Sequence, residues 1–230
     1  MSDIDAANRT GVAAYAYLGF AVAIAPDTNG DGDDELLMGA QGAGKVYIEF
    51  GPVSGTSAVT SADATDTSSG SQLGYSVSGA GDMNRDGYDD VIVGAVASEM
   101  ATIYLGGSSG ALKGSSYDLS GSGEAGTSVN AAGDVDNDGY DDVLVGAPSW
   151  ETGGKQYGAA YLVYGPVKSA LDLDTDADIF RGGAADDRAG YSLSGGGDVN
   201  ADGSPDFLIG APAQDSGGSA AGAAYLFLGL

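Results

Sequence analysis

The chain repeats one pattern of alternating and continuous apolar segments four times. Each repeat opens on a glycine, after which apolar side chains alternate with small or polar ones. These segments are Gly19–Ile24, Gly74–Gly79, Gly126–Ala131 and Gly190–Gly195. A period of two predicts a β-strand. A second segment of each repeat is apolar on both faces, which predicts a strand buried between neighbouring sheets. These runs are Leu36–Ala40, Val91–Ala95, Val143–Ala147 and Phe207–Ala211.

A third segment in each repeat is rich in Tyr, Val, Leu and Phe, and a weaker fourth precedes the next glycine. The third segments are Lys45–Gly51, Ala101–Gly106, Ala159–Gly165 and Ala223–Gly229. Equivalent acidic loops between the first two segments start at residues 27, 82, 134 and 198, so the repeats are 55, 52 and 64 residues apart. Four antiparallel strands at such a period predict the blades of a β-propeller.

The predicted fold is therefore all-β, a single propeller domain over residues 1–230 with four blades of four strands. Blade 1 covers about residues 11–65, blade 2 about 66–120, blade 3 about 121–182 and blade 4 about 183–230. The chain ends after the third strand of blade 4. We therefore expect an N-terminal strand within residues 1–10, around Asp3–Asp5, to complete the last blade and leave no edge unpaired.

The acidic loops carry oxygen-bearing side chains at positions 1, 3, 5 and 9, and a glycine at position 6. The side-chain ligands are Asp27, Asn29, Asp31 and Glu35; Asp82, Asn84, Asp86 and Asp90; Asp134, Asp136, Asp138 and Asp142; and Asp198, Asn200, Asp202 and Asp206. Position 7 is expected to add a backbone carbonyl, from Asp33, Tyr88, Tyr140 and Ser204. Six to eight oxygen ligands suit Ca²⁺. We therefore predict four Ca²⁺ per chain.

Two other interpretations of these loops are weaker. An EF-hand needs Glu at position 12, where this chain has Met38, Val93, Val145 and Ile209 within predicted strands. Metal-free Asp/Asn/Gly turns are common singly, but four copies in phase argue against that interpretation.

The motifs that surround the loops resemble the FG-GAP repeat of the integrin α-chain β-propeller and its bacterial relatives. Each unit runs from a glycine followed by Phe, Tyr or Thr, through the loop, to Gly-Ala-Pro at 146–148 and 210–212; Gly39-Ala-Gln41 and Gly94-Ala-Val96 lack the proline. The resemblance covers essentially the whole chain. It implies structural calcium, a location outside the cell or at its surface, and a module that binds proteins or glycans in adhesion.

The resemblance also raises a question of blade number, because integrin-type propellers have seven blades. Four blades close on themselves around a narrow axis, or two chains pair into an eight-bladed ring in which each N-terminal strand finishes the partner's last blade. We favour the homodimer, because it keeps blade packing nearer the family's geometry.

Composition narrows the partners and the chemistry. Eight basic and 33 acidic residues give a net charge of −25, which four Ca²⁺ would change to −17, the sum of −25 and +8. Such a surface disfavours nucleic acid and anionic lipid, and no apolar run predicts membrane insertion. The first ten residues lack the pattern of a signal peptide, so we expect the chain to be either cytosolic or a mature or excised segment of a secreted protein.

The chain contains no histidine and no cysteine, which removes most nucleophilic and zinc chemistry. We expect no enzyme activity. The alternatives are a carboxylate-dependent carbohydrate-active enzyme and a purely structural propeller scaffold.

Two further segments are interpreted less directly. The long loops between the second and third strands of blades 3 and 4 share a face opposite the metal loops. They include Trp150 and Tyr157, which we predict to contact a partner; packing of Trp150 on its own blade is the alternative. Asp172, Asp174, Asp176 and Asp178 alternate with apolar or small residues, which predicts a strand edge guarded by charge.

Overall fold

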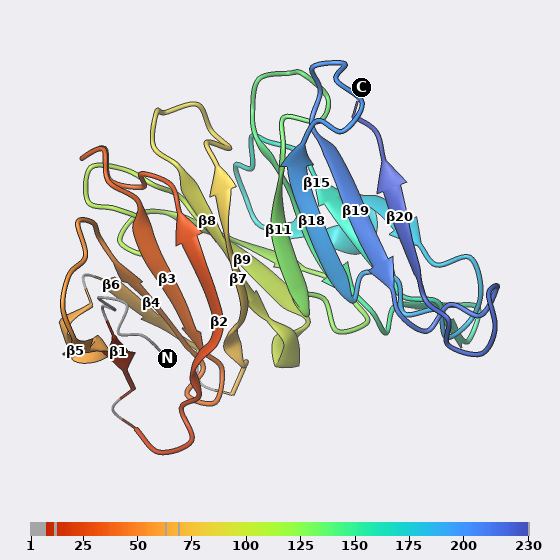
Figure 1. The fold of residues 1–230 in the computed structure, drawn as a ribbon, viewed down its shortest axis with the longest axis horizontal. Helices are drawn as coiled ribbons and strands as arrows, with labels where there is room; N and C mark the ends of the chain where they lie inside the picture. Colours follow the sequence, from red (N-terminus) through yellow and green to blue (C-terminus); the bar gives the residue numbers. More distant parts are fainter. Residues whose placement is uncertain (1–7, 12, 63, 69, 230) are drawn as a thin grey trace, which may run out of the picture.

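A computed structural model describes residues 8–11, 13–62, 64–68 and 70–229. The main strands of each repeat form one antiparallel sheet, and the four sheets follow one another along an open arc (Figure 1). We call these sheets blades 1 to 4. Blade 1, in red and orange, lies at one end of the arc, and blade 4, in blue, lies at the other.

The three inner strands of every blade lie where the apolar pattern predicts them. The first strands are β2 (Leu18–Ala25), β7 (Leu73–Gly81), β11 (Ser128–Gly133) and β18 (Ser192–Gly197). The second strands are β3 (Glu35–Ala40), β8 (Asp90–Ala95), β12 (Asp142–Ala147) and β19 (Asp206–Ala211). The third strands are β4 (Lys45–Glu49), β9 (Met100–Tyr104), β15 (Ala159–Val163) and β20 (Ala223–Phe227). The first strands contact one another in chain order along the inside of the arc.

A fourth strand completes blades 1 to 3. These outer strands are β6 (Ala64–Thr67), β10 (Ser116–Ser120) and β17 (Asp178–Arg181). Within the described residues, no strand pairs with the outer edge of β20, so blade 4 has three strands.

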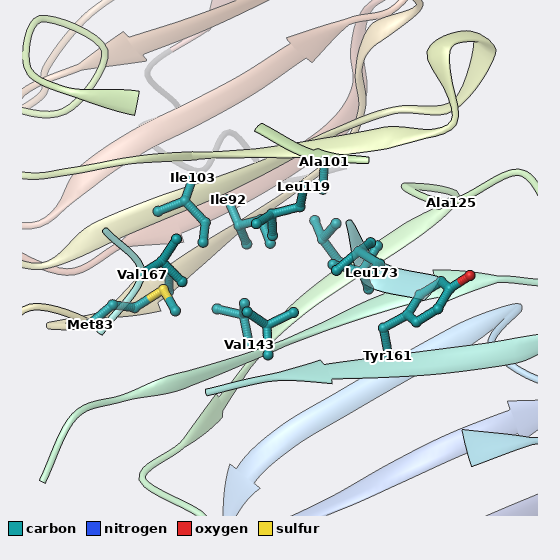
Figure 2. Close-up of a cluster of buried hydrophobic side chains, with 14 of the residues drawn as sticks. Met83, Ile92, Ala101, Ile103, Leu119, Ala125, Val143, Tyr161, Val167 and Leu173 are labelled. Atoms are coloured by element: carbon teal, nitrogen blue, oxygen red, sulfur yellow. The ribbon is translucent and has the colours of Figure 1, made fainter. Parts of the chain in front are cut away.

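Apolar side chains fill the three spaces between neighbouring blades. Val91 and Val93 of β8 face blade 1, whereas Ile92 faces blade 3, so this strand contributes to two clusters and is buried on both faces. Figure 2 shows the cluster between blades 2 and 3, where Ile92, Val143 and Tyr161 converge. The runs of blades 2 and 3 thus lie between neighbouring sheets, as predicted. The run Phe207–Ala211 of blade 4 does not, because Leu208 is 41% exposed at the end of the stack.

The acidic alternation after residue 170 is not the continuous strand that we predicted. Strand β16 (Leu171–Asp172) pairs in parallel with β10, and a one-turn helix, α1 (Leu173–Asp176), separates it from β17. The helix forms because the Asp172 carboxylate caps it by accepting a hydrogen bond from the Asp174 N–H, and because Leu173 is buried in the core. An alternating pattern cannot reveal such a cap.

The N-terminal strand also departs from the prediction. Strand β1 (Arg9–Thr10) pairs in parallel with β5 (Ser57–Ala58) beside blade 1, and not with β20, which lies at the other end of the arc. Residues 9–10 therefore do not complete blade 4 within this chain. Asp3–Asp5 lie outside the described residues.

The remaining elements are short. They are the hairpin of β13 (Glu151–Thr152) and β14 (Lys155–Gln156), and the 3₁₀ turns Val59–Ser61 and Val96–Ser98. In the part of the chain that the structure describes, no helix is long and apolar enough to cross a membrane.

Candidate metal loops

The four acidic loops occupy equivalent places, because each joins the first and second strands of its blade. In loops 1, 2 and 4 the carboxylate of position 1 lies inside the turn and accepts hydrogen bonds from its backbone. In loop 1, Asp27 accepts from the N–H groups of Asn29, Gly30, Asp31 and Gly32, at 2.6–3.3 Å. Burial opposes ionisation of Asp27, but these four donors together lower its pKa.

Positions 3, 5 and 7 continue this inward arrangement. In loop 1 the Asn29 amide oxygen accepts from the Asp31 N–H at 2.8 Å, and its amide group donates to the Asp31 carboxylate at 2.9 Å. Loops 2 and 4 repeat both bonds. In all four loops the N–H of position 7 donates to the carboxylate of position 5, from Asp33, Tyr88, Tyr140 and Ser204 at 2.9–3.0 Å.

The position-9 carboxylate is buried and braces the loop against the third strand. Asp142 accepts from the Val135 N–H inside its loop and from the Gly165 N–H after β15, both at 2.9 Å. Asp90 and Asp206 repeat this pair of bonds with their own blades. Burial raises the pKa of both Asp90 and Asp142 to about 7, although the backbone donors act in the opposite direction.

Loop 1 differs because its position 9 is Glu35. Glu35 Oε2 accepts from the Thr28 N–H at 2.8 Å, whereas Oε1 is buried and has no hydrogen-bond partner among the described residues. Burial raises the pKa of this carboxyl group. A buried carboxylate oxygen without a hydrogen-bond partner, in a cluster of carboxylates, is suited to coordinate a cation.

Two of the loops bring three carboxylates together. One oxygen each of Asp27, Asp31 and Glu35 lie within 4.8 Å of one another, and the same holds for Asp134, Asp136 and Asp138. Asp134 Oδ1 is likewise buried without a partner among the described residues. Loops 1 and 3 therefore fit a bound hard cation best. Loops 1, 2 and 4 have Asn at position 3, so only loop 3 has a carboxylate there, and in loop 1 the longer Glu35 side chain at position 9 completes the cluster.

Neighbouring loops also contact one another. The Tyr88 ring of loop 2 lies against Gly30 of loop 1, where a Cβ would be 2.7 Å from the ring. The Arg85 guanidinium of loop 2 lies 5.0 Å from the centre of the Tyr140 ring of loop 3. The Asn137 amide of loop 3 donates to Ser204 Oγ of loop 4 at 2.8 Å. The four loops thus form one continuous row along the arc.

Sequence reasoning missed the residues at position 8. The Asp141 carboxylate of loop 3 accepts from the Asp82 N–H of loop 2 at 2.8 Å, and the Asp89 N–H donates to the Asp27 carbonyl of loop 1 at 3.1 Å. Burial, and then the charges of Asp141, Asp82 and other nearby acids, raise the pKa of Asp89. The signal was present, because position 8 is Asp in loops 1 to 3.

Trp150 and Tyr157 lie in the loop between β12 and β15 and are half-buried. The Trp150 indole packs on the core between blades 2 and 3 and donates to the Asp174 carboxylate at 3.1 Å. The Arg181 guanidinium lies 5.5 Å from the centre of the Tyr157 ring. Both side chains are therefore engaged by their own part of the molecule, as the alternative interpretation of Trp150 expected.

A hollow of about 400 Å³ lies on the face opposite the metal loops. Its walls come from the starts of the first strands and from the turns after the second strands of blades 2 and 3. The lining residues are Gln72, Tyr75, Val96, Ala97, Glu124, Thr127, Pro148 and Tyr191. We predicted from the sequence that a partner binds on this face, and that stays a prediction. The lining residues could not be predicted, because the hollow exists only where three blades meet.

Comparisons with known proteins agree with this repeat. Residues 18–48 and 189–227 match the FG-GAP repeat, and residues 82–145 match the FG-GAP-like repeat. The chain is 31% identical to integrin alpha pat-2 of Caenorhabditis elegans, over 80% of this chain and 17% of that protein. It is 28% identical to integrin alpha-8 of Gallus gallus, over 88% of this chain and 21% of that protein. It is 30% identical to integrin alpha-8 of Homo sapiens, over 85% of this chain and 20% of that protein. The chain thus spans about a fifth of the length of these relatives.

Proposed function

From the premise that this chain is an FG-GAP repeat protein similar to integrin alpha chains, we propose that it is a calcium-stabilised, propeller-type binding module. It binds a protein or glycan ligand in adhesion, outside the cell or at its surface, and catalyses no reaction. The observation that carries the ligand-binding part is the hollow opposite the metal loops, which three blades build together.

Calcium has a structural role in this proposal. The carboxylates of positions 1, 5 and 9, joined by the oxygen of position 3 and the carbonyl of position 7, would hold one ion in each loop. Two unit charges about 4.8 Å apart repel by about 3–4 kcal/mol at an effective dielectric constant near 20. A bound cation reverses this repulsion and fixes the turn that joins the two buried strands of each blade.

The hollow has the features of a recognition site for a polar ligand. Tyr191 is exposed, and Tyr75 is half-buried with its ring 5.0 Å from that of Phe20. Glu124 and Gln72 add a carboxylate and an amide to the lining of the hollow. Aromatic faces beside hydrogen-bonding groups suit the apolar and hydroxyl faces of a sugar or a short peptide. A ligand seated here would contact blades held in register by the calcium row. A role for Trp150 and Tyr157 at the rim of this surface stays a prediction.

A binding screen with a matched pair of variants tests the proposal. The 230-residue chain, with calcium, is applied to panels of glycans and of matrix proteins. Tyr191→Ala, in the hollow, should weaken any specific binding at least tenfold, because it removes an aromatic contact of about 1.5 kcal/mol. Tyr164→Ala should leave binding unchanged, since Tyr164 follows β15 near the metal loops and not in the hollow.

Each other outcome counts against the proposal. Equal binding by both variants would place the ligand elsewhere. Binding to no member of either panel would favour a structural scaffold. Reproducible turnover of a glycan would favour the carbohydrate-active enzyme.

A further inference from the structure

Each internal blade interface contains the same backbone contact, in which a glycine of one blade (the plug) enters a recess in the preceding blade (the socket). Ser76 of blade 2 donates its hydroxyl to the Gly126 carbonyl of blade 3 at 2.8 Å, and Ser128 of blade 3 donates to the Gly190 carbonyl of blade 4 at 2.8 Å. The plug is the glycine that opens each first strand, with φ between +81° and +88° in all four blades. These φ values favour glycine.

The socket that receives the plug is equally specific. It includes a glycine of the second strand, at Gly39, Gly94 and Gly146, where a Cβ would clash with the carbonyl of the next blade's plug. It also includes the backbone at the start of the third strand, at Lys45, Met100 and Ala159, whose carbonyls face the plug. Small residues are required here because two backbones approach closely.

One plug and one socket have no counterpart within the described part of this chain. Gly19 of blade 1 has φ +81°, as a plug requires, and nothing lies within 4 Å of its Cβ position. In blade 4, Gly210 keeps its own Ser192 hydroxyl beside it, just as Gly146 keeps that of Ser128, but no plug carbonyl is within reach. Both halves are formed, at opposite ends of the arc.

The apolar residues around the Gly19 plug and the Gly210 socket are equivalent to those that fill the internal interfaces. Three equivalent positions contribute to the cluster at each internal interface. They are Leu37, Ile48 and Val77; Ile92, Ile103 and Val129; and Leu144, Leu162 and Leu193. The equivalent residues on blade 4 are Leu208 and Leu226, which are 41% and 48% exposed. Their equivalent on blade 1 is Val22, which is 67% exposed. Three residues of one missing interface are thus divided between the two ends.

A change of side-chain size makes these two ends specific for each other. Gly79 packs against blade 1, with its Cβ position 2.9 Å from Pro26, and Gly195 packs equally closely on blade 3. Blade 1 instead has Ile24 at this position, 69% exposed. Blade 4 has Gly196 at the next position, where blade 1 has Ala25. Nothing lies within 4 Å of the Cβ position of Gly196. By the packing of Gly79 and Gly195 on the preceding blade, Ile24 would lie against this part of blade 4, where Gly196 has no side chain.

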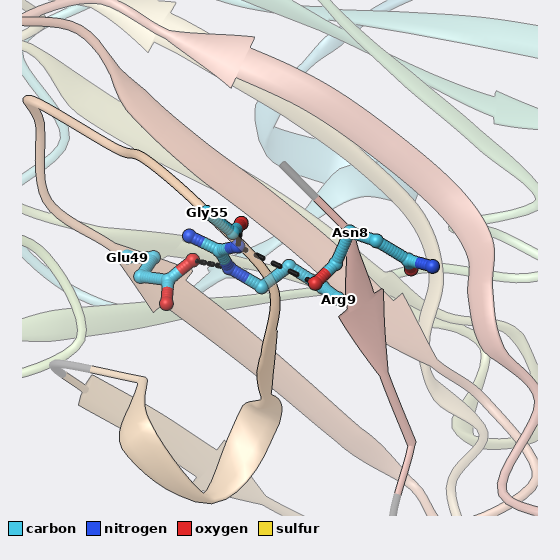
Figure 3. Close-up of polar contacts among 4 residues, drawn as sticks. All are labelled: Asn8, Arg9, Glu49 and Gly55. Carbon is cyan, nitrogen blue, oxygen red and sulfur yellow. Dashed lines mark hydrogen bonds and ion pairs between the residues drawn. The ribbon is translucent and has the colours of Figure 1, made fainter. Parts of the chain in front are cut away.

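Strand β1 is placed as the outer strand of the blade that would precede blade 1. It pairs in parallel with β5 as β10 pairs in parallel with β16, and β5 and β16 each lead through a short helical turn to a fourth strand. Figure 3 shows the anchor: Arg9 donates to the Glu49 carboxylate and, at 2.7 Å, to the Gly55 carbonyl. Strand β10 is also the fourth strand of blade 2. By this equivalence, β1 is placed to pair as a fourth strand with the open edge of β20 in another copy.

We infer that two copies of this chain join head to tail, with the Gly19 plug and β1 of each copy fitting the Gly210 socket and β20 edge of the other. Each end face is used once, so two interfaces of the same kind close an eight-bladed ring with twofold symmetry. The inference goes beyond the proposed ligand binding and holds whether or not the hollow binds a ligand.

Charge-complementation variants test this pairing in calcium-containing buffer, by light scattering coupled to size exclusion. The parent chain should have a mass of about 45 kDa, twice 22.6 kDa. Val22→Lys alone and Leu226→Asp alone should each halve that mass, because each places a charge in both interfaces of its own dimer. Thr152→Asp, on the exposed β13 strand, is the matched control and should stay at about 45 kDa.

The decisive arm mixes the two single variants. A mixed pair has one unchanged interface and one in which the positive charge introduced by Val22→Lys faces the negative charge introduced by Leu226→Asp, so about 45 kDa should return. Circular dichroism confirms that both variants are folded. A monomeric parent chain, a ladder of larger masses, dimers of either single variant, or no recovery on mixing would each overturn the inference.

Discussion

At the scale of single residues, the metal loops combine two tasks that the sequence pattern does not separate. Positions 1 to 7 form the turn around the expected ion. Position 9, which we also propose as a ligand, in addition accepts a hydrogen bond from the backbone that follows its own third strand, as Asp142 does from the Gly165 N–H. The spacing alone identified the acidic side chains that we predict to be ligands in these loops. It did not predict the brace, because nothing in the sequence tells that the end of the third strand lies beside the loop.

Two substitutions in loop 3 distinguish the stabilising hydrogen bonds of position 9 from the contribution of metal binding. In chelator, Asp142→Asn should lower the free energy of unfolding by about 1–3 kcal/mol, since an amide group then faces one of two buried backbone donors. Asp138→Asn should not lower it in chelator, because this substitution removes one of three carboxylates that repel one another in the absence of a cation. Urea unfolding measures both values.

Calcium should make the second substitution costly as well. With excess calcium, Asp138→Asn should lose the part of the stabilisation that loop 3 supplies, because one of its clustered carboxylates is gone. Equal effects of the two substitutions in chelator would contradict the separate roles.

At the scale of the elements, the period of the apolar residues was enough to predict the three inner strands of every blade. Strands such as β8 and β12 are buried on both faces by neighbouring blades, so burial follows directly from the sequence pattern. The segment around α1 was mispredicted because a single cap at Asp172 and one buried leucine decide its conformation. Pairing of β1 depends on where the ends of the arc lie, which no local pattern contains.

A matched pair of leucines tests how the blades are held together. Leu144 is buried between blades 3 and 4, and Leu208 occupies the same position at the free end of blade 4. In the Val22→Lys background, which removes any contribution from pairing, Leu144→Ala should cost about 2–5 kcal/mol of stability and Leu208→Ala less than about 1 kcal/mol. Chemical unfolding gives both numbers. A similar loss for both would mean that the end of blade 4 is covered within the chain.

At the scale of the whole molecule, the four loops form one row that runs across every blade. Contacts such as Arg85 with Tyr140 connect loops that lie far apart in the sequence. A chain with a net charge of −25 gathers many of its acids in this row. We therefore propose that bound calcium is required for a rigid stack of blades, for the shape of the hollow and for the fit of the two end faces.

Thermal unfolding with and without calcium tests this central claim most directly. The 230-residue chain is heated in calcium and again after treatment with excess chelator, and each unfolding midpoint is recorded by circular dichroism. The midpoint should be much higher in calcium, because the repulsion among the clustered carboxylates is then neutralised. Calcium restored to the chelated sample should recover the higher midpoint, whereas magnesium should recover little of it. Equal midpoints in calcium and in chelator would contradict the account.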